Sequence, residues 1–221
     1  NGCTLMDSAV ISEPSQLTVS LTGSNTSCYG LCNGLATANV SGGVSPYQYL
    51  WNDPFMQSTA IATGLCSGTY NIAITDDNGC VVNASWSINE PAVISLGTSA
   101  INTSCNGVCD GEGTVITTGG TSPYTYAWND PYGQSKVTAE DLCAGTYTVV
   151  VNDNNSCSDS ATVIITEPVD ITASTTGTAT SCYGTCDGDA TISSSGGTGT
   201  HIYQWDDPNN QTNASAIGLC A

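Results

Sequence analysis

The chain has almost no basic residues. Among its 221 residues lysine and arginine together occur once, as Lys136, against 19 aspartates and glutamates. The resulting net charge of −18 disfavours nucleic acid and anionic membrane surfaces as partners. His201 is the one histidine, and no group of nucleophile, base and orienting residue recurs, so we expect no enzyme. No apolar run approaches the about 18 residues of a membrane-spanning helix, so we expect no membrane insertion.

The sequence is strongly repetitive. The segment SGGVSPYQYLWNDP at 41–54 returns as TGGTSPYTYAWNDP at 118–131 and as SGGTGTHIYQWDDP at 195–208, an interval of 77 residues. Within it Tyr47, Tyr49 and Trp51 alternate with other residues, which is the period of a strand with one buried face. The repeat predicts that one small structural unit is built several times along the chain.

A glutamate followed by proline marks the boundary of each unit, because proline ends the hydrogen-bond ladder of the preceding strand and favours an extended entry. These steps occur at Glu13-Pro14, Glu90-Pro91 and Glu167-Pro168. They predict the terminal strand of a preceding repeat at 1–13, complete repeats at 14–90 and 91–167, and an incomplete repeat at 168–221.

Each unit is predicted to be a β-sandwich of about seven short strands. Turn residues occur every 8–12 residues and no stretch has a helical period, a pattern typical of this fold. The segment Asp76–Gly79 predicts a hairpin turn, and Tyr70, two residues after Gly68, predicts a tyrosine corner whose hydroxyl binds the preceding loop. The strands that we expect in the first unit are 16–21, 35–40, 47–51, 59–65, 70–75 and 80–88.

Twelve cysteines lie on the same 77-residue grid. They are Cys3, Cys28, Cys32, Cys66, Cys80, Cys105, Cys109, Cys143, Cys157, Cys182, Cys186 and Cys220. An even number in each unit favours disulfides formed in an oxidising compartment. Zinc is the weaker alternative, because the CxxxC pair is not matched by a second close pair. A bond between Cys66 and Cys80 is disfavoured, since the strand between them spans roughly 20 Å and a disulfide needs Cα atoms within about 7 Å.

The motifs together resemble the SprB-type repeat. They are SCYG at 27–30, SGG at 41–43, PYQYLW at 46–51, GLCSGTY at 64–70, TDDNGC at 75–80 and EP at 90–91. Repeats of this type build very large cell-surface adhesins of gliding Bacteroidetes-type bacteria. The resemblance covers the whole chain and implies an all-β fold of tandem immunoglobulin-like β-sandwich repeats, secretion, and service as a stalk or adhesive filament.

The resemblance also bears on the disulfides. The family usually shows only the cysteines equivalent to Cys28 and Cys80, so the joint addition of Cys32 and Cys66 implies that these two pair with each other. We therefore expect Cys28–Cys80 and Cys32–Cys66, with Cys105–Cys157, Cys109–Cys143 and Cys186–Cys220 as their equivalents. In a seven-strand sandwich the loop with Cys66 and the turn before Cys80 lie at opposite ends, whereas Cys28 and Cys32 are close in sequence. A bond between neighbouring units, such as Cys28 with Cys157, therefore remains an alternative.

Acidic turns are candidate Ca²⁺ ligands, since calcium takes six to eight oxygens. The alternative is that aspartate simply makes good turns. The candidates are Asp76, Asp77, Glu90, Asp153 and Glu167.

Two kinds of sequence are candidates for glycosylation. Asn25 and Asn102 lie in N-x-S/T sequons. Ser8 and Ser160 lie in Asp-Ser-Ala, which resembles the O-glycosylation signal of Bacteroidetes-type bacteria.

These features lead to one expected function and two alternatives. We expect a structural segment of a long extracellular filament or adhesin stalk, stapled by disulfides, whose partners are adjacent repeats or copies of itself. The first alternative is a module that binds glycans or surfaces, with the Tyr47–Trp51 strand stacking on sugars, although packing is the stronger interpretation of that strand. The second is a filament subunit that assembles by strand exchange, with 1–13 of one chain completing 168–221 of another.

Overall fold

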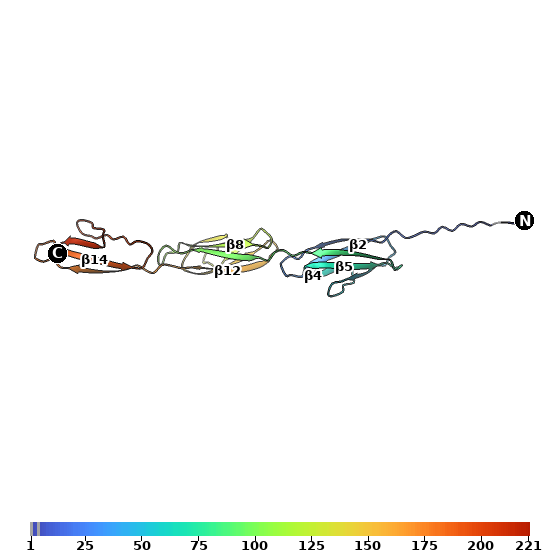
Figure 1. The fold of residues 1–221 in the computed structure, drawn as a ribbon, viewed down its shortest axis with the longest axis horizontal. Coiled ribbons are helices and arrows are strands. Elements are labelled where there is room, and N and C mark those ends of the chain that lie inside the picture. The colour runs from blue at the N-terminus through green and yellow to red at the C-terminus, as the bar shows by residue number, and fades with distance from the viewer. Residues whose placement is uncertain (1, 4) are drawn as a thin grey trace. The chain divides into compact units, whose positions relative to one another are not determined.

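The computed structural model describes residues 2–3 and 5–221, and its regular elements are all β-strands (Figure 1). The predicted all-β fold class is therefore confirmed. Over those residues there is no helix of the length and apolarity needed to cross a membrane.

The first repeat contains two antiparallel three-stranded sheets (Figure 1). One sheet has the order β1-β2-β4 and the other the order β3-β5-β6. The strands are β1 (Thr18–Ser24), β2 (Gly34–Ser41), β3 (Gln48–Trp51), β4 (Ile61–Leu65), β5 (Gly68–Thr75) and β6 (Val81–Ile88). They coincide with the expected strands to within a few residues, and they number six rather than about seven.

A single hydrophobic core joins the two sheets of the first repeat. Trp51 from β3 and Ile72 from β5 are 1% exposed, and they lie in one cluster with Ala36 of β2 and Leu65 of β4. Burial of side chains from both sheets stabilises their face-to-face arrangement at about 25 cal/mol per Å² of apolar area. The alternation of Tyr47, Tyr49 and Trp51 thus buries the tryptophan in the sandwich.

The second repeat is built in the same way, with sheets of order β10-β8-β7 and β12-β11-β9. Its strands are β7 (Ser95–Ile101), β8 (Gly111–Thr118), β9 (Thr125–Trp128), β10 (Thr138–Leu142), β11 (Gly145–Asn152) and β12 (Ser158–Ile165). The two cores differ at two equivalent positions. The buried Ala38 and the half-buried Trp86 of the first repeat correspond to the buried Val115 and Val163 of the second.

The third repeat consists of one sheet, with the order β13-β14-β15. Its strands are β13 (Thr172–Thr178), β14 (Gly188–Ser195) and β15 (Ser215–Leu219). Trp205 corresponds to Trp51, yet it lies in no strand and is only half-buried. In the first two repeats the strand that carries this tryptophan pairs with β5 or β11, and residues 168–221 contain no counterpart of those strands.

Two local motifs predicted from the sequence are present. The Tyr70 hydroxyl donates to the Cys66 carbonyl over 3.1 Å, so the predicted tyrosine corner is confirmed. Asp76 and Gly79 close the predicted hairpin turn through a 3.0 Å backbone bond. These bonds hold the loops at the two ends of β5 in fixed positions.

The chain divides into two compact units that cut across the sequence repeats. The first unit comprises the chain through Ser95 together with Thr118–Tyr124 and Asn152–Cys157. The second comprises Leu96–Thr117, Thr125–Val151 and Ser158–Ala221. Two loops of the second repeat therefore belong to the same unit as the whole first repeat, while the division at the Glu-Pro steps stays a sequence-based prediction.

Close backbone packing in the first unit requires glycine at one of these loops. Gly119 has a φ of 72°, and a Cβ atom added there would lie 1.9 Å from the carbonyl oxygen of Val93. A side chain at this position would clash with the backbone of Val93. The glycine of the predicted Gly-Gly turn therefore allows residues 118–124 to pack directly against the segment that precedes β7.

Candidate functional site

The candidate site is built around the loop that carries the CxxxC motif of the first repeat. The Leu31 amide donates to the Cys28 carbonyl over 3.2 Å, so the four residues from Cys28 form a tight turn. Asn33 fixes the start of this turn by accepting a 2.9 Å bond from the Ser27 amide. Glu90 fixes its centre by accepting a 2.8 Å bond from the Gly30 amide.

The cysteine that ends the turn bonds inside its own repeat. Cys32 is joined to Cys66, with a Cα–Cα distance of 3.9 Å and a sequence separation of 34. Cys109–Cys143 and Cys186–Cys220 are joined with the same separation. Each bond ties the loop before β2, β8 or β14 to the end of β4, β10 or β15.

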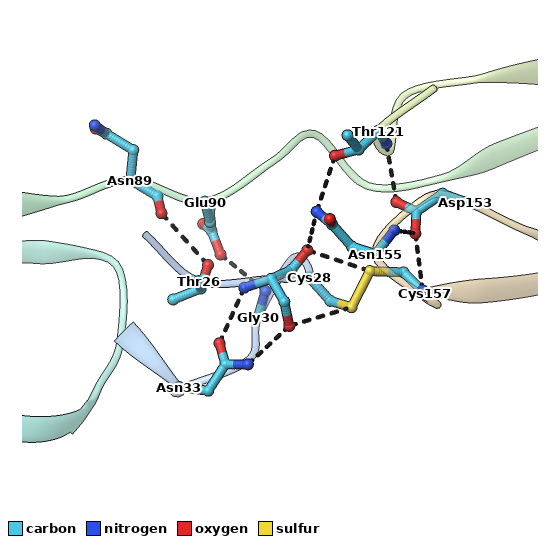
Figure 2. Close-up of a disulfide and its surroundings, with 11 residues drawn as sticks. Thr26, Cys28, Gly30, Asn33, Asn89, Glu90, Thr121, Asp153, Asn155 and Cys157 are labelled. Carbon is cyan, nitrogen blue, oxygen red and sulfur yellow. Dashed lines mark hydrogen bonds between the residues drawn. A yellow bond between two sulfur atoms is a disulfide. The ribbon is translucent and has the colours of Figure 1, made fainter. Parts of the chain in front are cut away.

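The cysteine that begins the turn bonds to a different repeat. Cys28 is joined to Cys157, with a Cα–Cα distance of 5.7 Å and a sequence separation of 129 (Figure 2). Cys157 lies in the turn between β11 and β12 of the second repeat, within the same compact unit as Cys28. This disulfide therefore links two consecutive repeats.

A buried carboxylate organises the turn that carries Cys157. Asp153 is 6% exposed, and it accepts backbone bonds from Thr121, Asn155 and Cys157 at 2.8–2.9 Å (Figure 2). Burial raises the pKa of Asp153, but these three N–H donors outweigh burial and hold the pKa below its ordinary value of 3.8. The carboxylate is thus ionised at neutral pH and sets the position of the Cys157 backbone.

Polar contacts accompany the disulfide. The Asn155 side-chain amide donates to the Ser27 carbonyl over 3.0 Å and to the Thr121 hydroxyl over 3.1 Å. The Cys157 sulfur lies 3.3 Å from the same Ser27 oxygen. The loop of the first repeat and the turn of the second repeat are therefore joined by hydrogen bonds as well as by the covalent link (Figure 2).

The expected pair Cys28–Cys80 is wrong, and so is its equivalent Cys105–Cys157. β6 runs for 8 residues after Cys80, which is roughly 26 Å at about 3.3 Å per residue. At its far end the Asn89 carbonyl binds the amide of Thr26, beside Cys28. A whole strand therefore separates Cys80 from Cys28, and the alternative of a bond between neighbouring repeats is the one that the structure contains.

Four cysteines of the described chain carry no disulfide, and all four are exposed. They are Cys3, Cys80, Cys105 and Cys182.

Asp76 and the exposed Asp77 share the turn between β5 and β6, and the other candidate calcium ligands lie elsewhere in the chain. Asp76 accepts bonds from the amides of Val44 and Cys80, as Asp153 does from its own turn. Glu90 binds the Gly30 amide, and Glu167 binds the equivalent Gly107 amide over 2.8 Å. Within residues 2–3 and 5–221, no three side chains of His, Cys, Asp or Glu lie close enough together to hold a metal ion. The structure thus gives these carboxylates a role in fixing loops, and calcium binding stays a prediction.

The four candidate glycosylation residues are exposed. Asn25 accepts a bond from the Asn89 amide through its side-chain oxygen, and Asn102 does the same for Thr166. Ser8 and Ser160 each donate their backbone amide to the preceding aspartate. Their modification stays a prediction.

A family model and several solved structures resemble the chain. The model of the SprB repeat matches residues 17–54 and 97–133, which contain the CxxxC loop and the tryptophan strand of the first two repeats. Both segments resemble SprB repeats. The resemblance predicted from the motifs is confirmed for these two segments, whereas its extension over the whole chain stays a prediction. The match supports a cell-surface, adhesin-type segment. Among curated proteins none matches the chain.

The solved structures are distant. A Dscam structure described for isoform specificity is 12% identical, with a TM-score of 0.31, and the alignment covers 68% of this chain and 46% of that one. The amphioxus IgVJ-C2 molecule is 13% identical, with 70% and 98% covered and a TM-score of 0.29. A tetra-tandem repeat from the extending region of a large adhesion protein is 14% identical, with 90% and 63% covered and a TM-score of 0.22. These neighbours indicate no function for this chain.

Proposed function

We propose that the chain is a structural segment of a long extracellular cell-surface filament or adhesin stalk, in which disulfides link consecutive repeats along their length. The observation that carries this proposal is the bond between Cys28 and Cys157, because its separation of 129 residues exceeds one repeat of 77. A bond of this kind bypasses most of two repeats when the chain is pulled from its ends. The function is mechanical, and the partners are the adjacent repeats.

The disulfides determine how far the segment can be stretched. With all bonds closed, the path between the termini omits 129 residues at Cys28–Cys157 and 34 at Cys186–Cys220, leaving 58 of 221. At about 3.3–3.6 Å per residue this path is roughly 200 Å when fully extended. The fully reduced chain extends to roughly 760 Å by the same measure.

Single-molecule pulling of the full chain from its two termini tests the proposal. We expect the nonreduced protein to reach roughly 200 Å. The Cys157→Ser variant keeps only the three bonds that span 34 residues, so 119 residues of the 221 become extensible, or roughly 410 Å. Equal extension of the nonreduced wild type and this variant would remove the mechanical role of the link.

A second candidate function is binding to glycans or surfaces, and exposed aromatic side chains favour it. Phe55 and Tyr132 occupy equivalent loop positions and are 80% and 77% exposed. The tryptophan strand is less suited to this role, because Trp51 is buried and donates its indole N–H to the Thr59 carbonyl over 2.9 Å. Loss of glycan-array retention in the double variant Phe55→Ala/Tyr132→Ala would support this function, and the absence of retention by the wild type would exclude it for the glycans tested.

A further inference from the structure

The four unpaired cysteines share a regular relation to the bonded ones. Cys28 begins a CxxxC loop, and its partner Cys157 lies 129 residues later in the turn before the last strand of the following repeat. Cys105 and Cys182 are the loop cysteines of the second and third repeats, while Cys80 and Cys3 are turn cysteines like Cys157. Two of the free thiols are thus of the loop kind and two of the turn kind.

The offset of 129 accounts for all four free thiols. A position 129 residues after Cys105 is 234, and the corresponding position for Cys182 is 311, both beyond Ala221. A position 129 residues before Cys80 or Cys3 falls before the first residue. Cys28 and Cys157 are the only pair of a loop cysteine and a turn cysteine that are 129 residues apart within the sequence. They are also the pair that forms a disulfide.

The loop of the second repeat already has the geometry of the bonded loop. The Ser104 amide donates to Asp110 over 2.9 Å, and the Gly107 amide donates to Glu167 over 2.8 Å. The Val108 amide closes the turn on the Cys105 carbonyl over 3.3 Å. These three bonds match those made around Cys28, so Cys105 needs no rearrangement of its own loop before it can bond.

A contact from the third repeat also reaches this loop. The Thr198 hydroxyl donates to the Ser104 carbonyl over 3.3 Å, and Ser104 corresponds to Ser27, whose carbonyl receives Asn155 beside the Cys28–Cys157 bond. Thr198 itself corresponds to Thr121. The carbonyl next to the loop cysteine is therefore contacted from the next repeat at both places, by Asn155 at the first and by Thr198 at the second.

We infer that each free thiol is one half of a further disulfide between consecutive SprB-type repeats. Cys105 and Cys182 bond to a turn cysteine of a following repeat, and Cys80 and Cys3 bond to a loop cysteine of a preceding one. The partner is therefore another repeat of this kind, either in a longer polypeptide or in a second copy of the chain. This inference rests on the proposed function and extends its single link to a continuous series.

The chemistry requires an oxidant. Two thiols give one disulfide with release of two protons and two electrons, and an external disulfide such as oxidised glutathione accepts them and becomes two thiols. A thiolate first attacks the external disulfide to form a mixed disulfide and release one glutathione thiolate. The second cysteine then attacks the protein sulfur of that mixed disulfide and releases the other.

The sequence itself provides the design of a test. Cys220-Ala221 corresponds to Cys143-Ala144, so a second copy of residues 145–167 appended after Ala221 continues the repeat and places a cysteine at position 234. The extended chain is oxidised with a glutathione buffer and treated with N-ethylmaleimide. The control is the same extension with its appended cysteine replaced by serine.

The inference predicts which thiol is lost. Alkylation of Cys105 falls by more than about tenfold in the extended chain, because a disulfide sulfur is not nucleophilic, and peptide mapping joins Cys105 to the appended cysteine. Peptide mapping does not join Cys182 to the appended cysteine. Alkylation of Cys105 at the level of the serine control, or bonding of the appended cysteine to Cys80 or Cys182, would overturn the inference.

The second part of the test uses protein isolated from its natural source. Thiols are blocked with N-ethylmaleimide before digestion, and Cys105 and Cys182 are expected in disulfide-linked peptides whose partners are turns of another repeat. Recovery of both as maleimide adducts overturns the inference even if the pulling experiment supports the Cys28–Cys157 link. A denaturing gel compares the apparent mass of the protein before and after reduction. An unchanged mass means that the partner repeats belong to the same polypeptide, and a lower mass after reduction means that they belong to other copies.

Discussion

The CxxxC loops of the first and second repeats have the same internal hydrogen bonds, yet their first cysteines differ. In each loop an Asn or Asp side chain accepts the serine amide at 2.9 Å, and a glutamate accepts the glycine amide at 2.8 Å. Cys28 is bonded to Cys157, whereas Cys105 is exposed and unbonded. The shape of the loop is therefore set within each repeat, and the loops differ in that the turn with Cys157 lies against Cys28.

The largest expected effect separates these two cysteines. Cys157→Ser removes the link that closes 129 residues, and the chain-entropy relation assigns such a loop about 5 kcal/mol at 25 °C. Cys105→Ser removes an exposed thiol and is expected to change the free energy of unfolding by less than about 0.5 kcal/mol. Denaturant unfolding monitored by tryptophan fluorescence measures both variants, and equal free energies would mean that the link does not stabilise the two repeats.

The next effect is expected to be the same in both repeats. Cys66→Ser and Cys143→Ser each open a bond that closes 34 residues, and each is expected to cost about 4 kcal/mol. Since these bonds lie within their own repeats, the two losses are expected to agree within about 0.5 kcal/mol. The same unfolding measurement compares the two variants, and a large difference between them would show that stabilisation within a repeat depends on the link between repeats.

The smallest expected effect is on the free energy of unfolding at acidic pH. Burial raises the pKa of Asp76 and of Asp153, but backbone N–H donors outweigh it and lower both below 3.8. The unfolded state then binds more protons, so this stabilisation is present above pH 3.8 and is lost as the pH falls through the lower folded values. The account predicts that the free energy of unfolding falls below that pH, and that Asp153→Asn reduces the fall. An unchanged acid profile in Asp153→Asn would contradict it, and Asp76→Asn is the matched variant in the turn of the unbonded Cys80.

Much of the fold follows from local sequence. The alternation of Tyr47, Tyr49 and Trp51 predicted β3, and the segment Asp76–Gly79 predicted the turn between β5 and β6. Both signals act through neighbours in the chain, although β3 also pairs with the distant β5. Trp205 shows the limit of these local signals. Its indole N–H still donates to the Asn213 carbonyl over 2.9 Å, as that of Trp51 does to the Thr59 carbonyl. Without a counterpart of β5, however, the Trp205 side chain is only half-buried.

The partner of Cys28 could not be read from the sequence, because Cys80 and Cys157 occupy the same position of consecutive repeats. The repeat makes them equivalent in every local respect, and only the distance across a whole sandwich separates the two choices. The usable signal was the length of the last strand. Eight residues carry the chain from Cys80 to the end of the sandwich where Cys28 lies, too far for a disulfide.

The measurement that tests the account most directly is mass spectrometric mapping of disulfides in the nonreduced full chain, digested with proteases that cut at acidic and aromatic residues. The account predicts a peptide pair that joins Cys28 to Cys157 and three pairs of the Cys32–Cys66 kind. A peptide pair that joins Cys28 to Cys80, or Cys105 to Cys157, would contradict the account. Each disulfide would then lie within one repeat, and none would link consecutive repeats.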